Sequence, residues 1–508
     1  MSTSGYRKRV TFLLFVLLLV RFWLSRTFEL TGPEAYAWLQ GRHLDWGFWD
    51  RGPLVPALSY LGTLFFGQTE LGVRWPAGVL YAATGFLLFY GTRQGFGPRA
   101  GFYSLLLFLV LPLYFWQMLL LSEAAVAVGL MALALLVYRQ VAERGRLEDW
   151  LAATLVTALA VGLSWWNLLW PAGFLLFRLL DPQRTGPWLS RHALVFILGT
   201  LGLGLAPFVI WQTGFHLVAT GTGAPPSAAS ILAESASHWL GPKLYASPAH
   251  VLGFLKDQFV WLGFAGLLAL AVLILRARDF PLLQRGHLLL LCVALPGLAL
   301  QFLLSFFHEG NPDVMAALYL PLVALAGSVA ARLLDPAAGP RPGFWGRARL
   351  LSFLGLAVLI VAGLETVSGL FAFGAKFWHG YAPNRRERPR AIATEVARLQ
   401  RDAGASFVIV SEPLWASLLS FYLPLQPSVY VPSHDKIHSQ FDLWPGYLDF
   451  EVSSALLMTR DAQPPAVVPR QFQTVRPLPG IPIPEAEAWD FFLCDRLASG
   501  TGRAGTQP

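Results

Sequence analysis

Residues 29–56 read ELTGPEAYAWLQGRHLDWGFWDRGPLVP, and they follow shortly after an apolar span, Val10–Leu24. The stretch places the carboxylates of Glu34 and Asp50 and the guanidinium of Arg51 among many aromatic side chains. Acidic groups beside a membrane are costly, so acids kept in such a place point to a function. We therefore expect the chemistry of this protein to begin in this loop.

The composition sets the class of protein. Of the 508 residues, 55% are hydrophobic and 13% are charged, and the mean hydropathy is +0.52. Together with apolar runs close to bilayer length, these values exclude an ordinary soluble protein and indicate an integral membrane protein. The two cysteines, Cys292 and Cys494, are too few and too far apart to suggest a disulfide framework or a metal site.

The apolar runs predict about eleven membrane-spanning helices. They lie near residues 10–25, 71–91, 100–118, 122–138, 150–165, 167–180, 192–211, 259–275, 287–306, 313–331 and 351–373. No small-residue cleavage site follows the first run, so we expect an uncleaved first helix. Arginine and lysine gather in alternate loops, which the positive-inside rule places in the cytoplasm together with the N-terminus. The net charge of +8 then reflects topology and gives no argument for nucleic-acid binding.

The chain is predicted to contain two domains, a transmembrane domain over residues 1–375 and a soluble domain over residues 376–508. Because the number of spans is odd, the second domain lies on the side opposite the N-terminus. A helix-like stretch, Pro389–Ala403, and a strand-like run, Phe407–Ser411, open it. Shorter apolar runs follow at 428–431 and 455–459. This alternation predicts a small α/β domain.

The polar residues outside the cytoplasm fall into four segments. These are the first loop (26–70), the hairpin 121–123, the loop 212–257 and the turn 308–313. All four connect to the outer ends of predicted spans, so we expect them to face one another at the outer membrane boundary.

Several motifs form a recognisable set. They are EAYAWLQGRHLDWGFWDRGPL (34–54), GQTELGVRWPAG (67–78), GFGPRAG (95–101) and LLLSEAAVAVGLMALAL (119–135). As a set they resemble the bacterial branch of the protein O-mannosyltransferase and lipid A aminoarabinose transferase superfamily, which belongs to the GT-C membrane glycosyltransferases. The resemblance runs to about Gln212 and extends weakly to 308–319 and to the tail stretches SFYLPLQPSVY (420–430) and SQFDLW (439–444).

The resemblance implies a polytopic α-helical GT-C fold with a small extracytoplasmic α/β domain. It implies a hexosyl- or pentosyltransferase that moves a sugar, with inversion, from a polyprenyl-phosphate donor to an envelope acceptor, which is a lipid, a glycan or a protein. The reaction takes place at the outer face of a bacterial cytoplasmic (inner) membrane, so membrane lipid is a partner and nucleic acid is not.

Such a transfer needs a carboxylate that takes the proton of the acceptor, a contribution worth about 10²–10⁴-fold. Glu34 is the first candidate, and Asp50 and Glu123 are the next. The departing phosphate gains negative charge, which a fixed cation stabilises in a water-poor site. The candidate substrate-binding residues are Arg51, Tyr36, Lys243, His308, Glu309 and Asn311.

The chain departs from the family pattern at three places. Pro33 stands where many relatives carry an aspartate, Asp50-Arg51-Gly52-Pro53 replaces an Asp-His-Pro-Pro pattern, and Trp165 stands where lysine is common. These differences keep a second hypothesis open, in which a non-catalytic relative binds a lipid-linked sugar or scaffolds an envelope complex. A lipid or sugar transporter is a weaker alternative, because its polar residues belong at the membrane midplane.

Structural roles compete with each assignment. An acid such as Glu34 also caps helices, and Arg51 also extends to lipid headgroups. Asp45 is expected to be structural, and the aromatic residues Trp38, Trp46, Phe48 and Trp49 are expected to form an interfacial belt. We expect no cofactor and commit to no metal, because neither His43 nor His308 belongs to a dedicated ligand motif; a divalent ion is the alternative.

The first prediction concerns topology. The tail from Lys376 onward should lie on the periplasmic or extracellular side, because the arginine-rich loops fix the opposite face inside. An alkaline phosphatase fused at about residue 400 should be active, and a fluorescent protein fused there should stay dark. An inactive phosphatase beside a glowing fluorescent protein would reverse the assignment.

Overall fold

The computed structural model describes residues 3–181, 183, 187, 189–220, 248–258, 262, 284–307, 312–333, 388–432, 438–448, 450, 453–478 and 489–497. The chain divides into two compact units. The helical unit comprises Met1–Ser25, Arg74–Ile210 and Pro226–Tyr381. The loop–tail unit comprises Arg26–Val73, Trp211–Pro225 and Ala382–Pro508. The predicted domain boundary at 375/376 falls among residues that are not described.

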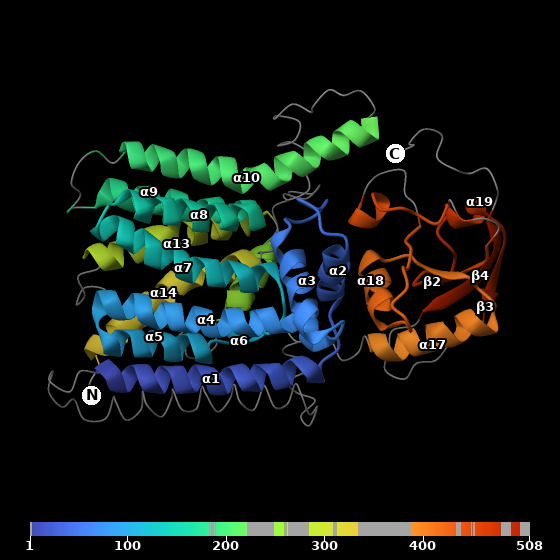
Figure 1. Ribbon diagram of the computed structural model, residues 1–508, viewed down its shortest axis with the longest axis horizontal. Coiled ribbons are helices and arrows are strands. Elements are labelled where there is room, and N and C mark those ends of the chain that lie inside the picture. Colours follow the sequence, from blue (N-terminus) through green and yellow to red (C-terminus); the bar gives the residue numbers. More distant parts are fainter. Residues whose placement is uncertain are drawn as a thin grey trace. The chain divides into compact units, whose positions relative to one another are not determined.

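Long apolar helices build the helical unit, where they lie side by side (Figure 1). Their bounds are α1 Thr3–Thr27, α4 Glu70–Phe96, α5 Pro98–Val110, α6 Pro112–Gln117, α7 Glu123–Glu143, α8 Leu147–Leu163, α9 Leu169–Leu180, α10 Arg191–Thr220, α13 Arg285–Leu304 and α14 Pro312–Leu333. Six helices in the described part of the chain are long and apolar enough to cross a membrane. The chain is therefore a multi-pass membrane protein.

The predicted spans near 10–25, 71–91, 100–118, 122–138, 150–165, 167–180, 192–211, 287–306 and 313–331 each coincide with one or two helices. The span near 351–373 and all of 259–275 except Leu262 lie outside the described residues, so the number of spans stays a prediction. The span near 100–118 is broken into α5 and α6. Leu111 is extended there, because the residue before a proline, here Pro112, avoids the helical conformation.

Two helices occupy the stretch that the sequence analysis treated as a loop. Helix α2 spans Gly32–Arg42 and helix α3 spans Leu54–Phe66. Thr31 and Glu34 form a capping box at the start of α2. Helix α3 ends at Gly67, whose φ of 70° favours glycine. The first loop is thus an ordered helical segment.

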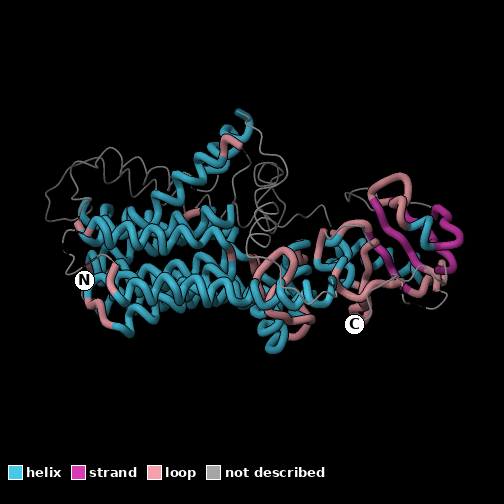
Figure 2. The backbone as a smooth tube through the Cα atoms, turned by 90° about the horizontal axis from the view of Figure 1, so that it is seen from above, coloured by secondary structure: helices cyan, strands magenta, loops and turns pink. Residues whose placement is uncertain are grey.

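The C-terminal part of the loop–tail unit contains one four-stranded sheet with strand order β1-β2-β4-β3 (Figure 2). Its elements are α17 Pro389–Asp402, β1 Phe407–Val410, α18 Pro413–Tyr422, a 3-10 turn η4 Gln440–Asp442, β2 Ala455–Thr459, α19 Val468–Gln471, β3 Phe472–Leu478 and β4 Asp490–Leu497. Strands β1 and β2 are parallel, and the other neighbours are antiparallel. The predicted helix at 389–403 and the strand-like run at 407–411 are confirmed as α17 and β1, and the apolar run 455–459 forms β2.

One face of this sheet shares its hydrophobic core with the first loop. Val408 and Leu456 on the sheet pack in the same cluster as Leu419 of α18 and Trp38 of α2. The opposite face of the sheet, which includes Ile409, forms a separate cluster. Because side chains alternate along a strand, the two faces bury different residues of the same short strands. Helix α2 therefore supplies part of the core of the tail.

The second prediction tests this shared core. Trp38 is 2% exposed, and its ring meets Phe421 of α18 edge-on at a centroid distance of 4.9 Å. Replacing a buried tryptophan by alanine costs about 3–5 kcal/mol. In the full-length protein in detergent, Trp38→Ala should lower the temperature at which thermolysin cleaves the tail.

Trp46→Ala is the matched control, because Trp46 lies in the same loop but is 61% exposed. Equal cleavage temperatures for the two variants would contradict a shared core.

Candidate functional site

Glu34 is buried at the first turn of α2. Its Oε2 accepts hydrogen bonds from the backbone N–H and from the hydroxyl of Thr31, both at 3.0 Å. The side chain is thus engaged in capping α2, and the residue is 1% exposed. Capping of a helix is one of the two roles that the sequence allows for Glu34, and catalysis is the other. Catalysis by Glu34 stays a prediction.

Asp50 and Arg51 form an ion pair in the turn that follows α2. The Arg51 Nε lies 3.6 Å from Asp50 Oδ2, and the two side chains are 15% and 24% exposed. Gln40 on α2 donates to Asp50 Oδ1 at 3.1 Å. An arginine thus lies within salt-bridge reach of a carboxylate of the first loop. Asp50 is therefore held in place and is still open to solvent.

The tail stretch SQFDLW contacts the first loop at this pair. The Gln440 backbone N–H donates to the Tyr36 hydroxyl at 3.0 Å, and its side-chain Oε1 accepts from the Trp49 backbone N–H at 2.8 Å. Tyr36 also stacks on Phe441 at 5.9 Å. The stretch SQFDLW belongs to the family resemblance, but its sequence carries no sign of these partners. We call Tyr36, Gln40, Asp50, Arg51 and Gln440 the Asp50 cluster.

Tyr36 lies at the centre of the cluster. Burial raises the pKa of its hydroxyl, and the nearby Asp50 carboxylate raises it further, while the Gln440 N–H and the Arg51 guanidinium oppose this. The Arg51 guanidinium carbon is 5.3 Å from the centroid of the Tyr36 ring. Tyr36 therefore stays protonated near neutral pH and does not act as a base.

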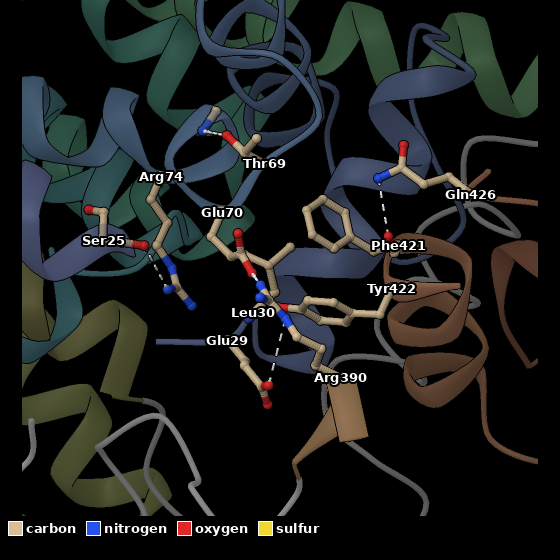
Figure 3. Close-up of polar contacts among 11 residues, drawn as sticks. Ser25, Glu29, Leu30, Thr69, Glu70, Arg74, Arg390, Phe421, Tyr422 and Gln426 are labelled. Atoms are coloured by element: carbon tan, nitrogen blue, oxygen red, sulfur yellow. Dashed lines mark hydrogen bonds and ion pairs between the residues drawn. The ribbon is translucent and has the colours of Figure 1, made fainter. Parts of the chain in front are cut away.

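A second contact between the first loop and the tail is drawn in Figure 3. Arg390 of α17 forms ion pairs with Glu70 and, at 4.0 Å, with Glu29. The Tyr422 hydroxyl donates to Glu70 Oε1 at 3.2 Å and accepts from the Leu30 backbone N–H at 2.7 Å. We call Glu29, Glu70, Arg390 and Tyr422 the Arg390 latch. Tyr422 belongs to the tail stretch 420–430, so both tail stretches of the resemblance contact the first loop.

The latch contains a partly desolvated acid. Burial raises the pKa of Glu29, the Arg390 backbone N–H and guanidinium lower it, and the Glu70 carboxylate raises it. A raised pKa in the folded state means that the ionised form of Glu29 is the less stabilised one. The contribution of Glu29 to the stability of the fold is therefore present at low pH and is lost as the pH rises through its folded pKa.

The other predicted site residues are placed as follows. Glu123 is the first residue of α7, directly after its N-cap Ser122, in the helical unit. A space shared by Glu123 with Glu34 and Asp50 therefore stays a prediction. Lys243 and the segment 308–311, which holds His308, Glu309 and Asn311, lie outside the described residues.

The aromatic residues of the first loop need a correction. Trp38 and Phe48 are buried, so they belong to the core of the loop–tail unit and not to an interfacial belt. Trp46 is exposed, as a belt residue would be, and its backbone N–H donates to Asp45 Oδ1 at 2.7 Å. Hydrophobicity alone gave no means of separating these residues. For Trp38, its place on the helix α2 was the missed signal.

Metal binding has no support from clustering of ligands. Among the residues that the structure describes, no group of three or more His, Cys, Asp or Glu side chains is arranged to hold a metal ion.

Comparison with known proteins agrees with this architecture. Residues 50–211 match the family model described as dolichyl-phosphate-mannose-protein mannosyltransferase. The chain has the fold of ArnT from Cupriavidus metallidurans, with a TM-score of 0.64 and 14% identity for the apo state. For the structure bound to undecaprenyl phosphate the values are 0.61 and 15%. Each comparison covers 95% of this chain and 97% of that one.

The chain therefore has the fold seen in ArnT, and the resemblance of the sequence to the GT-C membrane glycosyltransferases is confirmed. No curated protein sequence matches the chain.

The third prediction concerns the Arg390 latch. Arg390→Gln should free the Leu30 backbone N–H, because Glu29 and Glu70 then repel each other beside Tyr422. Exposed ion pairs contribute about 0–1 kcal/mol each, so we expect about fivefold faster hydrogen exchange at Leu30. Arg398→Gln on the same helix is the control, since the one ion pair of Arg398 among the described residues is with Glu395 of its own helix. Equal exchange rates at Leu30 in the two variants would contradict a role of the Arg390 latch in protecting the Leu30 backbone N–H.

Proposed function

We propose that the protein transfers a sugar from a polyprenyl-phosphate donor to an acceptor of the bacterial cell envelope, at the outer face of the cytoplasmic membrane. The observation that carries this proposal is the Asp50 cluster, in which a carboxylate and a guanidinium lie together in a chain with the GT-C fold. The ArnT structure with undecaprenyl phosphate supports a polyprenyl-phosphate donor. The sugar is a hexose or a pentose, and the acceptor is a lipid, a glycan or a protein.

The chemistry is a single displacement with inversion. An acceptor oxygen attacks the anomeric carbon of the sugar while the bond from that carbon to the phosphate oxygen breaks. The acceptor proton passes to a carboxylate, and the bonding electrons stay on the lipid phosphate. Asp50 is the favoured base, because it is partly open to solvent whereas Glu34 is engaged in capping α2. Arg51 supplies positive charge for the departing phosphate.

Residues outside the cluster have supporting roles in this proposal. Tyr36 and Gln440 hold the turn that carries Asp50 and Arg51. Glu123, Lys243, His308, Glu309 and Asn311 are proposed to complete the outer surface for the donor and the acceptor. Positioning of this kind accounts for a large share of catalysis in transfer reactions.

A second candidate function has one observation in its favour. The capping role of Glu34, beside Pro33 and with Trp165 in place of a lysine, is what a relative without catalysis would show. Such a protein binds a lipid-linked sugar or scaffolds an envelope complex. Failure of the purified wild-type protein to release sugar from any of a panel of polyprenyl-phosphate sugars would favour this function.

The fourth prediction assigns the base. With a labelled polyprenyl-phosphate sugar, Asp50→Asn should lower turnover about 10²-fold or more, because it removes the proton acceptor and keeps the shape. Glu34→Gln should retain most activity, since glutamine also completes a capping box. Arg51→Ala should lower turnover and raise the donor concentration required.

Thermal unfolding of each variant provides the folding control. An inactive but folded Glu34→Gln beside an active Asp50→Asn would move the base to Glu34. Near-normal transfer by both variants would leave the first loop without a base and would contradict the proposed mechanism.

A further inference from the structure

The helical unit contains a cavity of about 420 Å³ among the ends of α4, α7, α13 and α14. On α4 it lies near Phe96, and on α7 near Glu143, which are the last residues of those helices. Glu123, at the other end of α7, is therefore about twenty residues, or about 30 Å of helix, away. The cavity is distinct from the predicted transfer site.

The mouth of the cavity carries more positive than negative charge. Arg139 pairs with Glu143, and Arg285 pairs with Asp181. Arg332 instead donates to the neutral side chain of Gln284 at 3.0 Å. Among the described residues at this mouth, Arg332 thus has no carboxylate partner. An anion is the natural complement of this guanidinium.

The start of α13 adds a second, independent attraction for an anion. Gln284, Arg285 and Gly286 line the cavity, and Gln284 is the N-cap of this twenty-residue helix. Its side chain makes no capping hydrogen bond. The first N–H groups of a helix lack partners within the helix and carry partial positive charge, so they favour an anion near the mouth.

The walls of the cavity are apolar. The leucines that line them are Leu87, Leu88, Leu135, Leu136, Leu289 and Leu290. A small soluble anion gains no binding free energy from such walls. An acyl chain buries apolar surface against them, which contributes about 25 cal/mol of free energy per Å². The ligand that fits both parts is amphipathic, with an anionic head and a hydrocarbon tail.

The position of the cavity identifies the source of such a ligand. The ends of α4, α7 and α14 and the start of α13 belong to the arginine-rich side, which the positive-inside rule places in the cytoplasm. Anionic phospholipids in the adjoining leaflet meet this mouth directly, and basic pockets between membrane helices on that side bind such headgroups. We propose that the cavity binds the headgroup and the upper acyl chain of an anionic glycerophospholipid.

The experiment uses the full-length protein, purified in detergent and depleted of lipid. Native mass spectrometry measures binding of dioleoylphosphatidylglycerol, with dioleoylphosphatidylcholine as the neutral comparison. Arg332→Gln should weaken phosphatidylglycerol binding about fivefold, as expected for one basic residue near an anionic lipid. Arg332→Lys keeps the charge and should retain binding within about twofold.

Arg144→Gln is the matched control. Arg144 follows α7 on the same side of the unit and is exposed, but it does not line the cavity. It should leave phosphatidylglycerol binding unchanged. Leu136→Trp narrows the apolar part without altering charge, and it should weaken binding of the two-chain lipid.

Three results would overturn the proposal. Equal losses in Arg332→Gln and Arg144→Gln would mean general attraction to the basic surface. Full competition by inorganic phosphate would mean a site for the free anion. Displacement of phosphatidylglycerol by polyprenyl phosphate in an Arg332-dependent manner would assign the cavity to the donor lipid. Transferase activity enters none of these measurements.

Discussion

The burial of one face of α2 in the core of the tail is the constraint on which the candidate site depends. Trp38 packs on Phe421, and this contact fixes the helix that carries Tyr36 and Gln40. Those two side chains then hold Asp50 and meet Gln440. The ion pair of Asp50 with Arg51 is weak on its own, because exposed pairs gain little in water. The geometry of this ion pair therefore depends on the apolar packing of Trp38.

The local patterns of the sequence predicted a good part of the fold. Runs of about twenty apolar residues mark membrane helices without any knowledge of tertiary contacts. Helix α17 has a clear helical periodicity, whereas β1 and β2 are short apolar runs without alternation. Helix α2 was missed because its charged and aromatic residues were interpreted as chemistry, although Thr31 and Glu34 carry a capping signal. The hydrogen bond between Tyr36 and Gln440 joins residues 404 positions apart. No local pattern reports such a contact.

The position of Glu34 in the sequence agrees with two different roles. An acid at the third position of a helix is a common cap, and an acid beside a membrane is a common base. The two hydrogen bonds to Thr31 account for its burial without reference to catalysis. Asp50 has no such structural duty at a helix end. The distinction came from geometry, since both residues are acids in the same aromatic stretch.

The shared core also has a consequence for biogenesis. Helix α2 leaves the ribosome early, whereas Phe421 and the strands that cover Trp38 are among the last segments made. The intervening helices are made first, so the apolar face of α2 stays uncovered until the tail has been synthesised. Segments that keep apolar surface exposed during synthesis are prone to misassembly, and chaperones protect such segments. A chain that ended before α18 would therefore keep that face uncovered.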